Sequence, residues 1–206
     1  MGIYFNMKKA LLLVCILSIS VITTACINSF AVQELNNKAM ALMEIGNYSE
    51  AIERLKSSID LDASVFESHY NLAVAYTKAE DYINAMKSYQ KAISLNPDFA
   101  DCYYSLGVAE ENLATDLESG IIFVDENGEL KPSQEDTVYD DDVSKSEIKE
   151  QKLTEAEKIY INDLRKDAIK NYNEYLERGG DVSDKDEVLD QIKKLENKVK
   201  ENSAEE

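Results

Sequence analysis

The chain has 206 residues, with 40 aspartates and glutamates against 22 lysines and arginines, and a formal net charge of −18. Its 44% hydrophobic residues suffice for a core, whereas 7 glycines and 2 prolines are too few for the many tight turns of a β-sandwich or β-barrel. The acidic excess argues against nucleic-acid binding, because a basic face is needed to displace counterions from phosphates. Composition therefore predicts a helical, acidic protein.

The first 25 residues have the layout of a secretory signal peptide. Lys8 and Lys9 precede an apolar run of 13 residues, 10–22, which is shorter than the roughly 18 to 20 residues that a membrane-spanning helix needs. A basic start, a short apolar centre and small residues before the cleavage point are typical of such signals. We expect this segment to be absent from the mature chain.

The end of this segment, Thr23-Thr24-Ala25-Cys26, resembles the lipobox of bacterial lipoproteins, although Thr23 stands where leucine is usual. The resemblance implies that Cys26 is diacylated and becomes the first residue of the mature chain. Residues 26–31 would then be a lipidated tether, and the protein would be exported and anchored to the cell membrane, facing away from the cytoplasm. An ordinary cleaved signal with an incidental Cys26, or an uncleaved anchor, are the alternatives.

Residues 32–65 and 66–99 align without a gap, and each copy is 34 residues long. Matching positions hold apolar residues in both copies: Ala39 and Ala73, Leu42 and Tyr76, Tyr48 and Tyr82, Ala51 and Ala85, Leu55 and Tyr89, Leu61 and Leu95. The pattern resembles the tetratricopeptide repeat (TPR), from which the first copy departs with Lys38 and Ala63 where leucine and proline are usual. The resemblance implies an all-α solenoid of helix-turn-helix units.

A third copy begins at Ala100, but its second helix is displaced along the chain. The matching apolar residues are Ala168, Tyr172 and Tyr175, so we predict one repeat split by an insertion of about 49 residues. Two unrelated helices are the alternative. The repeats and this first helix would occupy residues 32–118.

The insertion concentrates the negative charge, because residues 116–150 carry twelve acidic residues and three basic ones. We predict a partly disordered acidic loop over 119–146, in which residues 121–131 are compatible with a short hairpin. Helical spacing of the apolar residues predicts a long helix over 147–178 and a capping helix over 183–200. We expect the terminal residues 201–206 to form a disordered tail.

In tetratricopeptide proteins the first helix of each repeat lines a concave, partner-binding groove. The positions of this chain that the resemblance places there are Gln33, Asn36, Met40, Met43, Glu67, Tyr70, Val74, Thr77, Lys78, Asp101, Tyr104, Val108 and Glu111. Tyr70 and Tyr104 are equivalent residues one repeat apart and would form a ladder. Some of these side chains are alternatively part of the core between repeats. Since only Asn71 fits the carboxylate clamp of the family, we expect a partner segment that is neutral or basic.

No catalytic motif is present, and we expect no enzymatic activity, no catalytic residue, no metal and no cofactor. His69 and Cys102 are expected to be packing residues, and weak divalent binding near Asp125–Glu129 is a minor alternative. The sequence thus predicts a membrane-anchored scaffold that binds a protein or peptide partner at the bacterial cell envelope. An assembly or chaperone-like factor for secreted or membrane proteins is the alternative.

Overall fold

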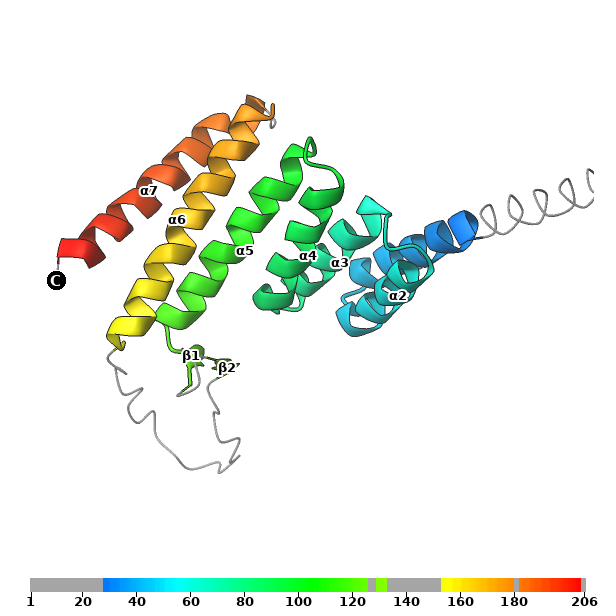
Figure 1. Cartoon of the computed structure of the whole chain (residues 1–206), viewed down its shortest axis with the longest axis horizontal. Coiled ribbons are helices and arrows are strands. Elements are labelled where there is room, and N and C mark those ends of the chain that lie inside the picture. Colours follow the sequence, from blue (N-terminus) through cyan, green and yellow to red (C-terminus); the bar gives the residue numbers. More distant parts are fainter. Residues whose placement is uncertain (1–27, 126–128, 133–152, 180–181, 205–206) are drawn as a thin grey trace, which may run out of the picture. The chain divides into compact units, whose positions relative to one another are not determined.

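The computed structural model of the chain describes residues 28–125, 129–132, 153–179 and 182–204. These residues form seven α-helices, one short 3-10 helix and a two-stranded hairpin (Figure 1), which confirms the predicted all-α class. The predicted signal peptide, Cys26 and much of the acidic insertion lie outside the described residues. The chain divides into two compact units, Met1–Glu80 and Asp81–Glu206.

The first unit contains a helix over residues 28–44, followed by α2 (Tyr48–Leu61) and α3 (Phe66–Lys78). Small side chains lie where these helices pack, and the buried cluster consists of Ala39, Ala51, Leu55, Leu72 and Ala75. Gly46, at φ 76°, makes the turn before α2, because glycine adopts this left-handed conformation without steric cost. The amides of Gly46 and Asn47 donate to the carbonyls of Met43 and Leu42, which closes this turn.

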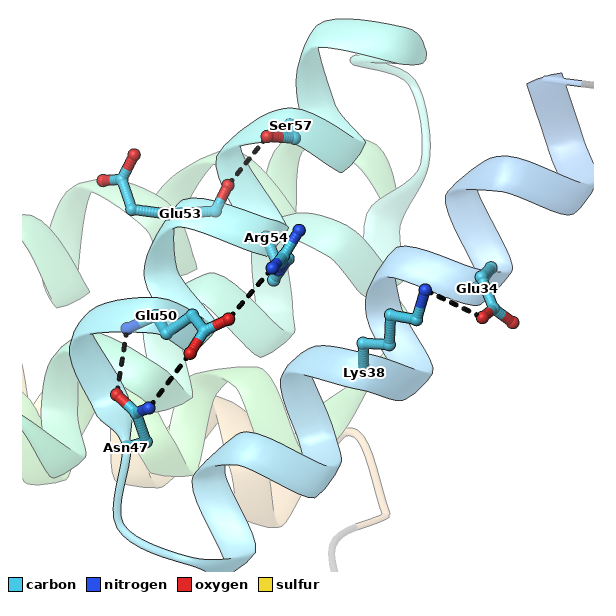
Figure 2. Close-up of polar contacts among 7 residues, drawn as sticks. All are labelled: Glu34, Lys38, Asn47, Glu50, Glu53, Arg54 and Ser57. Carbon is cyan, nitrogen blue, oxygen red and sulfur yellow. Dashed lines mark hydrogen bonds and ion pairs between the residues drawn. The ribbon is translucent and has the colours of Figure 1, made fainter.

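Asn47 fixes the start of α2. Its side-chain oxygen accepts a hydrogen bond from the amide of Glu50, and its side-chain nitrogen donates to the Glu50 carboxylate (Figure 2). The exposed sides of the two neighbouring helices carry ion pairs one turn apart, Lys38 with Glu34 and Arg54 with Glu50 (Figure 2). Such exposed pairs contribute little to stability, about 0.3–0.5 kcal/mol each. The first unit is therefore held together mainly by its buried cluster and not by these ion pairs.

The second unit contains α4 (Tyr82–Leu95), α5 (Ala100–Glu118), α6 (Glu155–Glu177) and α7 (Lys185–Ala204), the last preceded by a 3-10 turn. Within this unit α5, α6 and α7 lie side by side in that order (Figure 1). Their shared buried cluster consists of Tyr103, Ala168, Tyr172, Tyr175, Val188, Ile192 and Leu195. The three residues used to assign the displaced helix, Ala168, Tyr172 and Tyr175, therefore all face this core.

Gly107 allows α5 and α6 to approach closely. A methyl group on Gly107 would lie 3.0 Å from Cε1 of Tyr172 and 3.3 Å from the carbonyl oxygen of Ala168. The ring of Tyr172 thus packs directly on the backbone of α5. This contact joins two helices separated by the whole insertion.

Two predicted boundaries were wrong. The long helix begins at Glu155 rather than at residue 147, because Leu153 and Thr154 are not helical and Thr154 is the N-cap of α6. Residues 147–152 lie outside the described ranges. The final helix runs to Ala204, so most of the predicted tail is helical. Helix α6 ends at Glu177, one residue before the predicted end, and Gly179 follows at φ 83°.

The hairpin after α5 is formed by β1 (Ile122–Val124) and β2 (Leu130–Pro132), paired antiparallel with Val124 opposite Leu130. Ile122, Val124 and Leu130 pack against the buried cluster of Leu113, Ala114, Leu117, Ile161 and Leu164. The compatible hairpin over 121–131 is therefore formed, and the expectation of a loop over this part of 119–146 was wrong. The apolar residues of β1 pack on a buried cluster at the end of α5, which explains why this segment forms a hairpin instead of a loop.

Candidate functional site

Asn36 does not belong to a binding groove, contrary to the prediction. It is 8% exposed, and its side-chain nitrogen donates to the hydroxyls of Ser58 and Ser68 at 2.9 and 2.8 Å. Its side-chain oxygen accepts from the amide nitrogen of Asn71 at 3.0 Å. Asn36 is thus the centre of a buried polar network that joins three helices of the first unit.

The other predicted groove residues of the first unit differ in exposure. Met40 is 48% exposed and Lys78 is exposed, whereas Met43 packs against the buried cluster. Tyr70 and Val74 are half-buried, and the ring of Tyr70 stacks on Phe66 at 6.0 Å. The hydroxyl of Thr77, a further groove residue, donates to the carbonyl of Ala73 in its own helix. The ladder from Tyr70 to Tyr104 spans the two units and stays a prediction.

In the second unit, three predicted groove residues surround one cavity. Tyr104, Val108 and Glu111 of α5 line a hollow of about 210 Å³. We name this the α5–α7 hollow, and its other lining residues are Asn112, Tyr172, Glu187, Val188 and Gln191. Asp101, the fourth groove residue predicted on α5, is exposed and does not line it.

The α5–α7 hollow has an aromatic wall. The ring of Tyr104 lies 5.6 Å from that of Tyr172 and 5.2 Å from that of Tyr175, both at tilted angles. Tyr104 keeps 38% of its surface exposed, so this aromatic wall is open to a partner. Such tilted rings form a rigid apolar surface with defined geometry.

A carboxylate is held in place on the same hollow. Glu111 accepts hydrogen bonds from the hydroxyl of Tyr172 at 3.0 Å and from the side-chain amide of Gln191. Gln191 and Glu187 come from α7, which the sequence predicted to be only a cap. They were missed because a contact between residues 80 positions apart depends on how α7 packs on α5 and α6.

A second cavity, of about 330 Å³, lies on another side of α5 and is lined by Glu110, Asn171 and residues of α4 and α6. Glu110 is 3% exposed and accepts a hydrogen bond from Asn171 at 2.8 Å. The pKa of its carboxyl is raised to about 8, mainly by burial and to a lesser degree by the nearby Asp167, while the hydrogen bond from Asn171 and the charge of Lys170 act in the opposite direction. The sequence pattern did not identify this buried acid.

His69 and Cys102 are packing residues, as predicted. Nε2 of His69 donates to the carbonyl of Ala63 at 3.0 Å, and the ring is 7% exposed. Cys102 is fully buried, and this burial raises its thiol pKa to about 12. A neutral thiol is a poor nucleophile and metal ligand.

In the parts of the chain that the structure describes, no cluster of three histidine, cysteine or acidic side chains is arranged to hold a metal ion. The carboxylates of Asp125 and Glu129 lie 3.5 and 2.8 Å from the ammonium group of Lys131. The same described ranges contain no helix whose length and hydropathy suit it to cross a membrane.

Two family models match the sequence. One is described as the tetratricopeptide repeat and covers residues 66–99, and the other is described as a TPR repeat and covers residues 40–79. Residues 40–99 therefore carry tetratricopeptide repeats, as the 34-residue spacing predicted. A comparison with curated protein sequences finds no match.

Several solved structures share the fold. The first TPR of Spaghetti (RPAP3), bound to the HSP90 peptide SRMEEVD, has a TM-score of 0.54 and 17% identity, covering 83% of this chain and 94% of that one. The second TPR domain of human RPAP3, in complex with the HSP70 peptide SGPTIEEVD, has a TM-score of 0.53 and 15% identity, covering 82% and 98%. The first TPR domain of human RPAP3 has a TM-score of 0.53 and 16% identity, covering 84% and 95%. These similarities establish a tetratricopeptide-type helical solenoid.

Proposed function

We propose that this chain is a binding scaffold that holds a peptide or helix of a partner protein on its tetratricopeptide surface, at the bacterial cell envelope. The observation that carries the proposal is the gathering of Tyr104, Val108 and Glu111 around the α5–α7 hollow. An open aromatic wall beside a fixed carboxylate offers both apolar contact and a polar anchor, which is the usual composition of a protein-binding hot spot.

The related structures support this role at the level of the fold. The two RPAP3 domains that share the fold bind peptides of HSP90 and HSP70. Their peptides, SRMEEVD and SGPTIEEVD, are acidic. The hollow of this chain is also acidic and would repel such peptides. We therefore transfer the mode of binding, a peptide on a helical surface, and not the kind of peptide.

The location in this proposal rests on the sequence. The basic start, the 13-residue apolar run and the lipobox-like residues before Cys26 support export and lipid attachment. Two acyl chains on one cysteine are enough for stable membrane anchoring. The scaffold would then face away from the cytoplasm.

Crosslinking in native envelopes, followed by mass spectrometry, tests the binding role. We expect the wild-type chain to crosslink reproducibly to one partner, and the variant Tyr104→Ala to lose it. Tyr160→Ala is the matched control, because Tyr160 on α6 is 37% exposed, against 38% for Tyr104, and does not line the hollow. A partner that both variants retain equally would contradict the role of this surface.

A panel of unfolded client proteins distinguishes the scaffold from the chaperone-like alternative. A scaffold binds its partner tightly and ignores the panel, whereas a chaperone binds many clients weakly. Comparable affinity for most clients would favour the alternative.

The variant Cys26→Ser tests the anchor. We expect the wild-type chain to partition into the detergent phase of a membrane extract, and the variant to move to the aqueous phase. A variant that stays with the detergent would argue for an uncleaved anchor instead of a lipid.

A further inference from the structure

The α5–α7 hollow is too small for a drug-sized ligand but large enough for the end of a side chain. Its volume of about 210 Å³ corresponds to roughly seven water molecules, at about 30 Å³ each. Small-molecule sites usually measure about 300–1,000 Å³. The fitting occupant is therefore one side chain of a bound peptide.

The charged residues that line the hollow are all acidic. None of the eight residues that line it is basic, and two of them, Glu111 and Glu187, are acidic. The pKa of the Tyr104 phenol is raised, first by burial and then by the negative charges of Glu187 and Asp184. A positively charged group entering the hollow would therefore be stabilised, and a carboxylate would be repelled.

The two acids of the hollow have different roles. The Glu111 carboxylate already accepts hydrogen bonds from Tyr172 and Gln191, which fix its position. Glu187 is exposed and forms no hydrogen bond or ion pair with any described residue, so its carboxylate is available to a ligand. The pKa of the Lys194 ammonium group is raised mainly by its pairing with Asp190 at 2.8 Å, and to a lesser degree by the negative charges of Glu111 and Glu187.

Aromatic rings complete the chemistry. A guanidinium group stacks on a tyrosine ring and at the same time donates in-plane hydrogen bonds to a carboxylate, whereas an ammonium group is a more strongly hydrated point charge. Tyr104 and Glu187 line the same hollow and provide these two partners. A glutamine side chain ends in an uncharged carboxamide, so the two acids of the hollow would not attract it.

We propose that the α5–α7 hollow is a subsite for a basic side chain of the partner segment, with arginine preferred over lysine. Tyr104 provides the ring surface, Glu187 the free carboxylate, and Glu111 a second negative charge that Tyr172 and Gln191 hold in place. The proposal deepens the proposed function, on which it rests, by stating which residue type the partner presents at this position.

Methyl NMR on the full chain in a non-ionic detergent tests the proposal, because Val108 and Val188 line the hollow and serve as probes. The ligands are three acetylated pentapeptide amides, Gly-Ser-X-Ser-Gly, in which X is arginine, lysine or glutamine. We expect saturable shifts of both valines with the arginine peptide, weaker binding of the lysine peptide and no saturable shift with the glutamine peptide. Equal shifts with the arginine and glutamine peptides would overturn the proposal.

Matched variants separate the subsite from the general negative field of the chain. Glu187→Gln is expected to weaken the arginine peptide at least threefold, whereas Glu196→Gln removes the same charge from an exposed position on the same helix and should change binding less than 1.5-fold. Tyr104→Leu keeps an apolar side chain but removes the ring, and it should also weaken binding at least threefold. Equal weakening by Glu187→Gln and Glu196→Gln would mean that only the overall charge matters, and would refute the subsite.

The crosslinking experiment distinguishes failure of this inference from failure of the proposed function. If the native partner is retained by Glu187→Gln and Tyr104→Leu, and the arginine peptide does not bind, the basic subsite is wrong while the scaffold role stands. If the wild-type chain crosslinks to no partner, the scaffold role itself is wrong.

Discussion

Replacing Glu110 by glutamine is expected to remove a large part of the pH dependence of stability. Glu110 is 3% exposed, and burial raises the pKa of its carboxyl to about 8, whereas an unfolded glutamate titrates near 4.5. Below the unfolded value both states are protonated, and the group imposes no penalty. As the pH rises toward 8, the unfolded state loses its proton while the folded state keeps it, so the folded state loses stability.

The size of this effect follows from the two pKa values. Each pH unit between them costs about 1.4 kcal/mol, and the cost levels off as the pH approaches 8. Between pH 6 and pH 8 the wild-type chain should therefore lose about 2 kcal/mol through this residue, which corresponds to roughly 4–8 °C in Tm for a chain of this size. Glutamine has nearly the same shape and can still accept the hydrogen bond from Asn171.

Urea unfolding followed by circular dichroism at pH 6 and pH 8 measures this difference. We expect Glu110→Gln to lose about 2 kcal/mol less than the wild type over this range, while the exposed control Glu196→Gln behaves as the wild type. A Glu110→Gln chain that loses as much stability as the wild type would refute the reasoning, because the carboxyl would then titrate alike in both states.

Three further substitutions test the packing. Gly107→Ala should lower the free energy of unfolding by about 1–3 kcal/mol, because the added methyl group is too close to the ring of Tyr172. Helix propensity alone predicts the opposite, a raised Tm, and that result would contradict the packing argument. Asn36→Ala should cost about 1–3 kcal/mol in urea unfolding, because the side-chain amide of Asn71 loses its acceptor and the hydroxyls of Ser58 and Ser68 keep only each other as partners. The exposed neighbour variant Asn37→Ala should cost little, and equal losses would count against the network. Thr154→Ala should cost about 1 kcal/mol and speed hydrogen exchange in the first turn of α6; unchanged exchange there would mean that the cap is not needed.

The repeat architecture could be predicted because its signals are local. The alanines Ala39 and Ala51 are readable from the 34-residue alignment, and the turn glycine Gly46 and Pro97, which follows the end of α4, are readable as single residues. These features fix where helices start, stop and approach one another. The start of α6 also has a local signal in the sequence, since Thr154 and Glu157 form a capping box.

The candidate site was only partly predictable because its chemistry depends on contacts between distant residues. Asn36 occupies the repeat position of Tyr70 and Tyr104, and was assigned to the groove for that reason. Its burial follows from Ser58 and Ser68, whose hydroxyls provide partners for a polar side chain in the core. The contribution of α7 to the hollow likewise depends on tertiary packing that no local pattern encodes.

Glu157 also ties the hairpin to α6. One of its carboxylate oxygens accepts hydrogen bonds from the amide and hydroxyl of Thr154, and the other accepts from the amide of Val124 at 3.2 Å. Leu130 and Leu153, on either side of residues 133–152, pack on the same buried cluster. The residues that flank this stretch are thus anchored on one buried cluster, and doubling the number of residues between two fixed points costs only about 0.6 kcal/mol. Residues 133–152 are therefore a suitable position for inserting an epitope or a fluorescent reporter, with which the protein can be followed in living cells while its folded body stays intact.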